Sequence, residues 1–191
     1  MDQKRRVREG FPSLVGGCRL RVRNHRWNHR SGSPAGTGRL KASAWHRRKG
    51  GTQAQAIGRS RGGLTTKIVA LVDALGNLAR FVLLPGQRHD SVGVAPLLKD
   101  LDFAALLADK AFDSDVIRAD LDDRGAVAVI PPKANRAVGI PCDFEMYKWR
   151  HLVENFFCKI KEFRRIATRY DKTDESFKAM IHLIGIVLAT R

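Results

Sequence analysis

Four side chains with chemically useful groups are spaced to share one face of a helix: Tyr147, Arg150, Glu154 and Lys161. At about 100° per residue, all four fall within roughly 60° of one another. A carboxylate beside a guanidinium and an ammonium could hold a metal ion or meet a phosphate group. The alternative is a surface helix with ordinary ion pairs such as Arg150–Glu154, each worth about 0.2–0.5 kcal/mol. The opposite face would be the core side, with Leu152, Phe156, Ile160 and Phe163.

A second carboxylate, Asp109, follows an apolar run at residues 103–108, and Lys110 comes directly after it. A side chain at the carboxyl end of a central strand projects into the crevice where α/β sheets usually bind ligands. If Glu154 lies alongside, the two carboxylates could hold divalent cations such as Mg²⁺. Two such ions about 4 Å apart could activate a water or hydroxyl against a phosphodiester. By itself, Asp109 could equally be a turn former or a helix cap.

A short segment at residues 58–63 consists of three glycines, a serine and two arginines. Glycines allow a close approach of the backbone to a ligand, and Arg59 and Arg61 suit phosphate oxygens. The segment is not a P-loop, because it lacks the Gly-Lys-Ser/Thr ending. It could also be a flexible loop without a ligand.

The elements that would position these groups begin near residue 65. Apolar runs and turn residues predict strands at 65–73, 78–84, 103–108 and 125–130. Helices are expected at 90–98, capped by Asp90–Ser91, and up to 124, capped by Asp113 or Ser114. The four-residue face lies on a third helix, and a fourth from Thr173 or Asp174 has core-spaced apolar residues: Phe177, Met180, Ile181, Ile184 and Leu188. This order predicts an α/β fold with a mixed sheet flanked by helices.

Composition points to an anionic partner. The chain of 191 residues has a formal net charge of +16, and nucleic acid is the expected partner. Three cysteines, Cys18, Cys142 and Cys158, form no close pair and have no metal-site spacing, which favours a reducing compartment. No apolar run is long enough for a membrane span, and no signal peptide is evident, so a cytoplasmic, nucleoid-associated location in a bacterium is expected.

The basic excess is concentrated in residues 1–50, which hold 14 Lys and Arg against only Asp2 and Glu9. This stretch mixes Arg, Gly, Ser, Trp and His without a helix or strand period, so we expect a disordered basic arm that binds polyanions. His25 and His29 are four residues apart, but the arginines beside them disfavour a metal site. The division expected from composition is a basic arm at 1–50 and a folded, mildly basic domain at 51–191.

Several motifs resemble those of DDE-type insertion-sequence transposases, in the group named after insertion sequence five. The Tyr-x2-Arg-x3-Glu-x6-Lys signature of that family matches residues 147–161 in all four residues and every gap. Residues 107–114, Leu-Ala-Asp-Lys-Ala-Phe-Asp-Ser, are similar to its second-aspartate segment, with Ala111 and Phe112 in place of Gly and Tyr. Residues 58–67, 83–90, 129–132 and 163–171 also resemble stretches of the group. The resemblance covers about residues 51–191.

This resemblance implies a ribonuclease-H-like domain in which three carboxylates bind two Mg²⁺ ions. Such enzymes cut transposon ends and join the freed 3′-hydroxyls to target DNA. Carried onto this sequence, Asp109 is the second carboxylate and Glu154 the third, and both are the expected metal ligands. The accessory residues, expected to meet DNA phosphates, are Tyr147, Arg150, Lys161, Lys110, Arg59 and Arg61. Family members generally act as dimers or larger assemblies, which implies a homo-oligomer here.

The chain departs from the family at the first carboxylate. The family carries an aspartate in an Asp-Ser-Thr motif on its first strand, whereas no Asp or Glu occurs here between residues 10 and 72. Asp73 is no substitute, because it enters the hairpin turn. The fold is therefore expected to be incomplete at the first strand, with a weakened metal site. Removing one member of a catalytic unit usually costs orders of magnitude in rate.

Two functions follow as expectations. The first is a transposase for DNA transposition, with little or no strand cleavage. The second is a catalytically silent DNA-binding remnant that could interfere with full-length transposase by mixed assembly.

The break in composition near residue 51 suggests the hypothesis that residues 1–50 come from a shifted reading frame or a rearranged copy. An alignment of the gene's nucleotide sequence with intact insertion sequences tests this hypothesis. We expect an Asp-Ser-Thr motif in another frame upstream of residue 51. If no frame encodes a first strand with that motif, a frame shift is ruled out.

Overall fold

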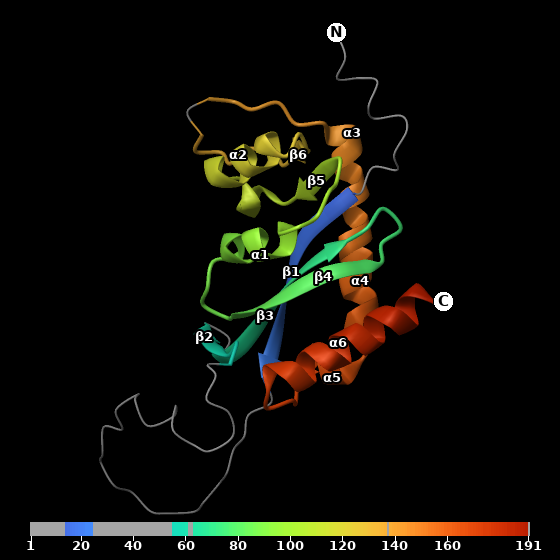
Figure 1. Ribbon diagram of the computed structural model, residues 1–191. Helices are drawn as coiled ribbons and strands as arrows, with labels where there is room; N and C mark the ends of the chain where they lie inside the picture. Colours follow the sequence, from blue (N-terminus) through green and yellow to red (C-terminus); the bar gives the residue numbers. More distant parts are fainter. Residues whose placement is uncertain (1–13, 25–54, 61–62, 137, 191) are drawn as a thin grey trace, which may run out of the picture.

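The computed structural model describes residues 14–24, 55–60, 63–136 and 138–190 (Figure 1). Its strands are β1 (Leu14–Asn24), β2 (Gly58–Ser60), β3 (Gly63–Val72), β4 (Leu78–Pro85), β5 (Ala105–Ala108), β6 (Val127–Val129) and β7 (Thr168–Arg169). Its helices are α1 (Val94–Leu98), α2 (Asp115–Asp123), α3 (Phe144–Tyr147), α4 (His151–Lys161), α5 (Arg164–Ala167) and α6 (Asp174–Ala189). Short 3₁₀ turns are η3 (Asp90–Gly93), η4 (Lys110–Phe112) and η5 (Lys148–Arg150).

The strands form one mixed sheet in which β3 and β1 lie side by side at the centre. β3 pairs antiparallel with both β4 and β1, while β5 runs parallel to β1 and β6 parallel to β5. The short β2 and β7 pair with β3 and β1. The order β4-β3-β1-β5-β6 therefore has an antiparallel half and a parallel half, which confirms the α/β class.

β3 explains why helices cover both faces of the sheet. Eight consecutive residues of this strand, Thr65 to Val72, are buried. Because side chains alternate between faces, Ile68, Ala70 and Val72 belong to one apolar cluster and Val69 and Leu71 to another. A strand buried on both faces needs a near-continuous apolar sequence, which this one has.

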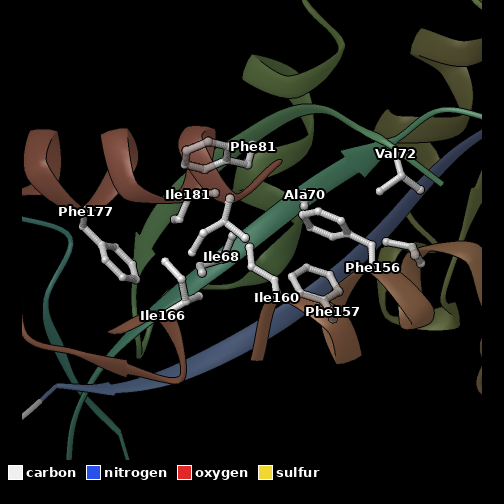
Figure 2. Packing of buried hydrophobic residues seen from close by; sticks show 12 residues of the cluster. Ile68, Ala70, Val72, Phe81, Phe156, Phe157, Ile160, Ile166, Phe177 and Ile181 are labelled. Atoms are coloured by element: carbon white, nitrogen blue, oxygen red, sulfur yellow. The ribbon is translucent and has the colours of Figure 1, made fainter. Parts of the chain in front are cut away.

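The first cluster joins β3 to α4, α5 and α6 (Figure 2). Its fully or nearly fully buried helix residues are Val153, Phe156, Phe157, Ile160, Ile166, Phe177, Ile181 and Ile184. The second cluster covers the other face with α1, β5 and α2. The core side predicted for the long helix is confirmed for Phe156 and Ile160, and the core spacing predicted for the last helix is confirmed for Phe177, Ile181 and Ile184.

One prediction for the N-terminal stretch is wrong. Residues 1–50 were expected to contain no regular element, and the sheet was expected to be incomplete at its first strand. Instead β1 lies between β3 and β5 and fills the first-strand position. The segment Arg19-Leu-Arg-Val-Arg23 does alternate with the period of a strand. His25 and His29 lie outside the described part, as do the residues of the expected arm before and after β1.

Smaller predictions also change. The segment at 58–63, expected to be a loop, begins as β2 and pairs with the start of β3. Asp90 and Asp113 do not cap helices. His89 occupies the N-cap position of η3, and Ser114, the other predicted cap, occupies that of α2, in both cases without a side-chain bond. Both aspartates are buried in ion pairs instead. Asp73 serves the hairpin turn as expected, since its Oδ1 accepts hydrogen bonds from the Leu75 and Asn77 backbone N–H groups.

Residues 144–161 form a continuous run of α3, η5 and α4, three residues longer at its start than predicted. Asp143 caps the run by accepting a hydrogen bond from the Met146 backbone N–H at 2.9 Å. Thr173 caps α6 in the same way, as predicted. Within the described ranges, no helix combines the length and apolar character needed to cross a membrane.

The packing of α6 predicts a sharp contrast between two isoleucines on that helix. Ile184 is 3% exposed and Ile186 is 63% exposed. We expect Ile184→Ala to lower the free energy of unfolding by about 2–5 kcal/mol, because it leaves a cavity in the core. Ile186→Ala is the matched control and should change it by less than about 0.5 kcal/mol. Urea denaturation followed by circular dichroism measures both, and equal effects would contradict the packing of α6 against β3.

Candidate functional site

Asp109 stands where β5 ends. The four residues of β5 are buried, and the chain turns into η4 directly after them. The turn is closed by a 2.8 Å hydrogen bond from the Phe112 N–H to the Asp109 carbonyl oxygen. Because a buried strand and a bonded turn hold its backbone on both sides, Asp109 presents a fixed carboxylate. Its side chain is 37% exposed, so the carboxylate faces solvent.

The helical run at 144–161 brings the other candidate residues to this point. Met146 and Tyr147 pack on Ala105, Leu107 and Val129, on β5 and β6. This contact seats the start of the run against the strand that carries Asp109. The helix spacing then places Arg150 and Glu154 on the same side as Tyr147, as the sequence predicted.

Arg150 joins the two carboxylates. Its Nη1 lies 3.2 Å from Asp109 Oδ1, and its Nη2 donates a 2.7 Å hydrogen bond to Glu154 Oε1. The structure thus brings together two acidic residues that are 45 positions apart in the sequence. Burial lowers the pKa of the Arg150 guanidinium, but the charges of Asp109 and Glu154, the neighbouring Tyr147 phenol and the hydrogen bond to Glu154 outweigh it and raise the pKa above its usual value. Arg150 is therefore a permanent cation between two anions.

Tyr147 completes this cluster. Its hydroxyl donates to Asp109 Oδ1 at 3.2 Å, and its ring lies 5.4 Å from the Arg150 guanidinium carbon. Burial raises the pKa of the phenol; the Arg150 charge lowers it, and the nearby Asp109 raises it further. The net direction is upward, so at neutral pH Tyr147 is a hydrogen-bond donor and a poor base.

The remaining predicted cations are placed differently. Lys110 and Lys161 are exposed, and Lys161 lies about 10 Å along α4 from Glu154 on nearly the same face. Arg59 is not brought to the carboxylates. It pairs with Leu64 at the start of β3, whereas Asp109 lies level with the far end of that strand, roughly 20 Å away. Arg61 lies outside the described residues.

A buried aspartate next to the site was missed by sequence reasoning. The Asp113 side chain is fully buried, and it accepts hydrogen bonds from Arg118 Nε at 2.8 Å and Arg136 Nε at 2.7 Å. The Lys133 backbone N–H donates at 2.8 Å to Asp113 Oδ2, the same oxygen that accepts from Arg136, whereas Arg118 donates to Oδ1. This network ties the turn that follows Asp109 to the segment that leads toward Tyr147. The partners lie up to 23 residues away, and a single sequence gives no signal for them.

Comparisons with known proteins agree on one kind of domain. Two families, each described as a transposase DDE domain, match residues 20–141 and 106–190. A Brucella ovis protein named as a transposase for insertion sequence element IS6501 is 38% identical over 122 residues, which cover 63% of this chain and 94% of that protein. No solved structure matches the chain.

The Asp113 network predicts a dependence of stability on acid. Burial raises the pKa of Asp113, but hydrogen bonds from Arg136, Lys133 and Arg118 outweigh it and hold the pKa well below its usual range. Because folding lowers this pKa, the stabilisation is present above the unfolded value of about 3.9 and is lost as the pH falls below it. We expect Asp113→Asn to lower the free energy of unfolding at pH 7 by about 3 kcal/mol.

The difference between the wild-type chain and Asp113→Asn should shrink between pH 5 and pH 3, measured by urea denaturation at each pH. Asp120→Asn is the control, since Asp120 pairs with Arg124 at the surface and is 43% exposed. It should cost under about 1 kcal/mol. An equal loss in both variants would show that Asp113 is not a special anchor.

Proposed function

The chain belongs to the transposase DDE domain family, and on that premise we propose that it is a transposase-derived protein of DNA transposition with impaired strand cleavage. It binds DNA at the ends of an insertion sequence, and target DNA, through the surface around Asp109 and Glu154. The observation that carries this proposal is the convergence of both carboxylates on Arg150. A surface that carries two acidic groups with a guanidinium held between them suits a phosphodiester better than a neutral ligand.

The strand order supports a finer assignment of the fold. Three antiparallel strands followed by two parallel ones, in the order β4-β3-β1-β5-β6, are what a ribonuclease-H-like domain would need. Asp109 at the end of β5 is then the second carboxylate of the family, and Glu154 on α4 the third. The motifs at residues 58–67 and 163–171 favour the group named after insertion sequence five.

The family implies divalent metal ions, and the residues present do not fit a two-ion site. Asp109 and Glu154 are already paired with a cation, Arg150. In the part of the chain that the structure describes, no three His, Cys, Asp or Glu side chains gather as a metal cluster. β1 passes beside Asp109, with Cys18 one position beyond the Gly17–Ala108 pair, but its eleven residues include no carboxylate. This is the physical reason for expecting impaired cleavage.

What the side chains themselves can do is bind and orient DNA. Arg150 can hold a phosphate with two parallel hydrogen bonds. Lys161 and Lys110, which are both exposed, can meet neighbouring phosphates as point charges. Tyr147 keeps the Asp109 carboxylate in place through its hydroxyl.

A second candidate function follows from the same missing carboxylate. The chain would then be a catalytically silent DNA-binding remnant that interferes with full-length transposase by mixed assembly. A chain that keeps the cleft and its cations, yet lacks one acidic group, could occupy transposon ends without cutting them. Copies of this chain would also assemble with one another, through the surfaces that serve mixed assembly.

Terminal-repeat DNA taken from the flanks of the gene tests these proposals. We expect salt-sensitive binding by fluorescence anisotropy, and nicking in Mg²⁺ no faster than that of Glu154→Ala. Lys161→Gln should weaken binding and reduce the salt dependence by about one counterion. Lys178→Gln, which removes an exposed lysine on α6, is the matched control and should do neither.

Each outcome has a clear meaning. Rapid nicking that Glu154→Ala abolishes would show a working enzyme and refute the impairment. Binding without nicking, together with inhibition of an added full-length transposase, would favour the silent remnant. Absence of salt-sensitive binding would refute both functions.

A further inference from the structure

We infer that Arg150 is the resident counter-ion of the Asp109–Glu154 pair: it offsets one of the two negative charges in the DNA-free chain, and a divalent ion enters only when Arg150 is withdrawn. This inference rests on the proposed function, because it assigns a reason for the misfit between the carboxylate pair and a two-ion site.

The geometry of the guanidinium is that of a bridge. Two different nitrogens of Arg150 engage two different carboxylates, at 3.2 Å for Asp109 and 2.7 Å for Glu154. Since Arg150 precedes Glu154 by one helical turn and Asp109 comes from β5, the bridge also links the helix to the sheet.

Arg150 is held in this bridge by its surroundings. Its side chain is 19% exposed, against 37% for Asp109 and 50% for Glu154. The Tyr147 ring lies beside the guanidinium, 5.4 Å from its carbon, a distance at which a cation and an aromatic ring attract. The Tyr147 hydroxyl binds the same Asp109 oxygen that faces Arg150. The cation is thus the most protected charge of the three.

A divalent ion would have to compete with this cation. An ion within reach of both carboxylates would lie within a few ångströms of the guanidinium, and two cations at that distance repel strongly. A DNA phosphate offers Arg150 another partner of the right shape for two hydrogen bonds. Transfer of Arg150 to the phosphate would free the carboxylates, so DNA should raise the affinity for the ion and the ion should raise the affinity for DNA by the same factor.

The test measures Mn²⁺ binding to the full chain without DNA, by loss of the free-ion signal in electron paramagnetic resonance. Removing the guanidinium in Arg150→Gln should tighten Mn²⁺ binding about tenfold or more. Lys159→Gln removes the same charge from an exposed side chain of the same helix, which has no contact with the carboxylates among the described residues. It should leave the affinity within about twofold. Circular dichroism confirms that each variant is folded.

A double variant, Arg150→Gln with Glu154→Gln, places the new affinity in the cleft. It should lose the gain seen for Arg150→Gln alone. A short terminal-repeat duplex should raise the Mn²⁺ affinity of the wild-type chain, after subtraction of ions bound by the duplex itself, and should have little effect on that of Arg150→Gln.

Three results would overturn the inference: no gain for Arg150→Gln, including no binding by either chain; an equal gain for Lys159→Gln; or a gain that survives in the double variant. Failure of the proposed function is a separate result. If the chain binds no terminal-repeat DNA while Arg150→Gln still tightens Mn²⁺ binding, the counter-ion role stands and the DNA function falls.

Discussion

The burial of β3 on both faces is the constraint on which the rest of the molecule depends. A strand with residues 65–72 buried needs an apolar layer on each side. On one side, α4 and α6 supply it through Phe156, Ile160 and Ile181. Because α4 is fixed there by its apolar face, its polar face is fixed as well. The position of Glu154 is therefore a by-product of core packing.

The site adds a second constraint, which is electrostatic. Two carboxylates from distant segments would repel each other in a half-exposed cleft. Arg150 offsets that repulsion, and the Tyr147 hydroxyl stabilises the negative charge of Asp109 by donating a hydrogen bond to it. The positive charge of Arg150 also disfavours binding of a divalent ion to these carboxylates in the free chain. Stability of the acidic pair and readiness for metal chemistry are thus opposed at this site.

Sequence reasoning predicted the elements whose signal is local. The period of Phe177, Ile181 and Ile184 predicts α6 and its buried face. The approach of Glu154 to Asp109 was predicted from strand-end position, helix spacing and resemblance to transposases. β1 was missed because the alternation at Arg19–Arg23 is short and because alternating arginines are not expected in a central strand of a sheet.

The buried ion pairs were missed for a different reason. Asp113 meets Arg118, Arg136 and the Lys133 backbone only after β5, α2 and the segment beyond β6 have packed. The sequence shows an aspartate before a helix, where capping is the usual local role. Tertiary pairing overrode that preference. The same holds for Asp90, which pairs with Lys67 of β3.

The pairings of β1 have a consequence for how the protein folds during translation. Among the described strands, β1 is translated before the others, yet it pairs with β3, then with β5, and finally through Arg23 with Thr168 of β7. Such distant partners make closure of the sheet a late event. During translation the β3–β4 hairpin must wait with its apolar faces uncovered, a state prone to aggregation. The yield of native molecules should therefore depend on how fast the last helix follows.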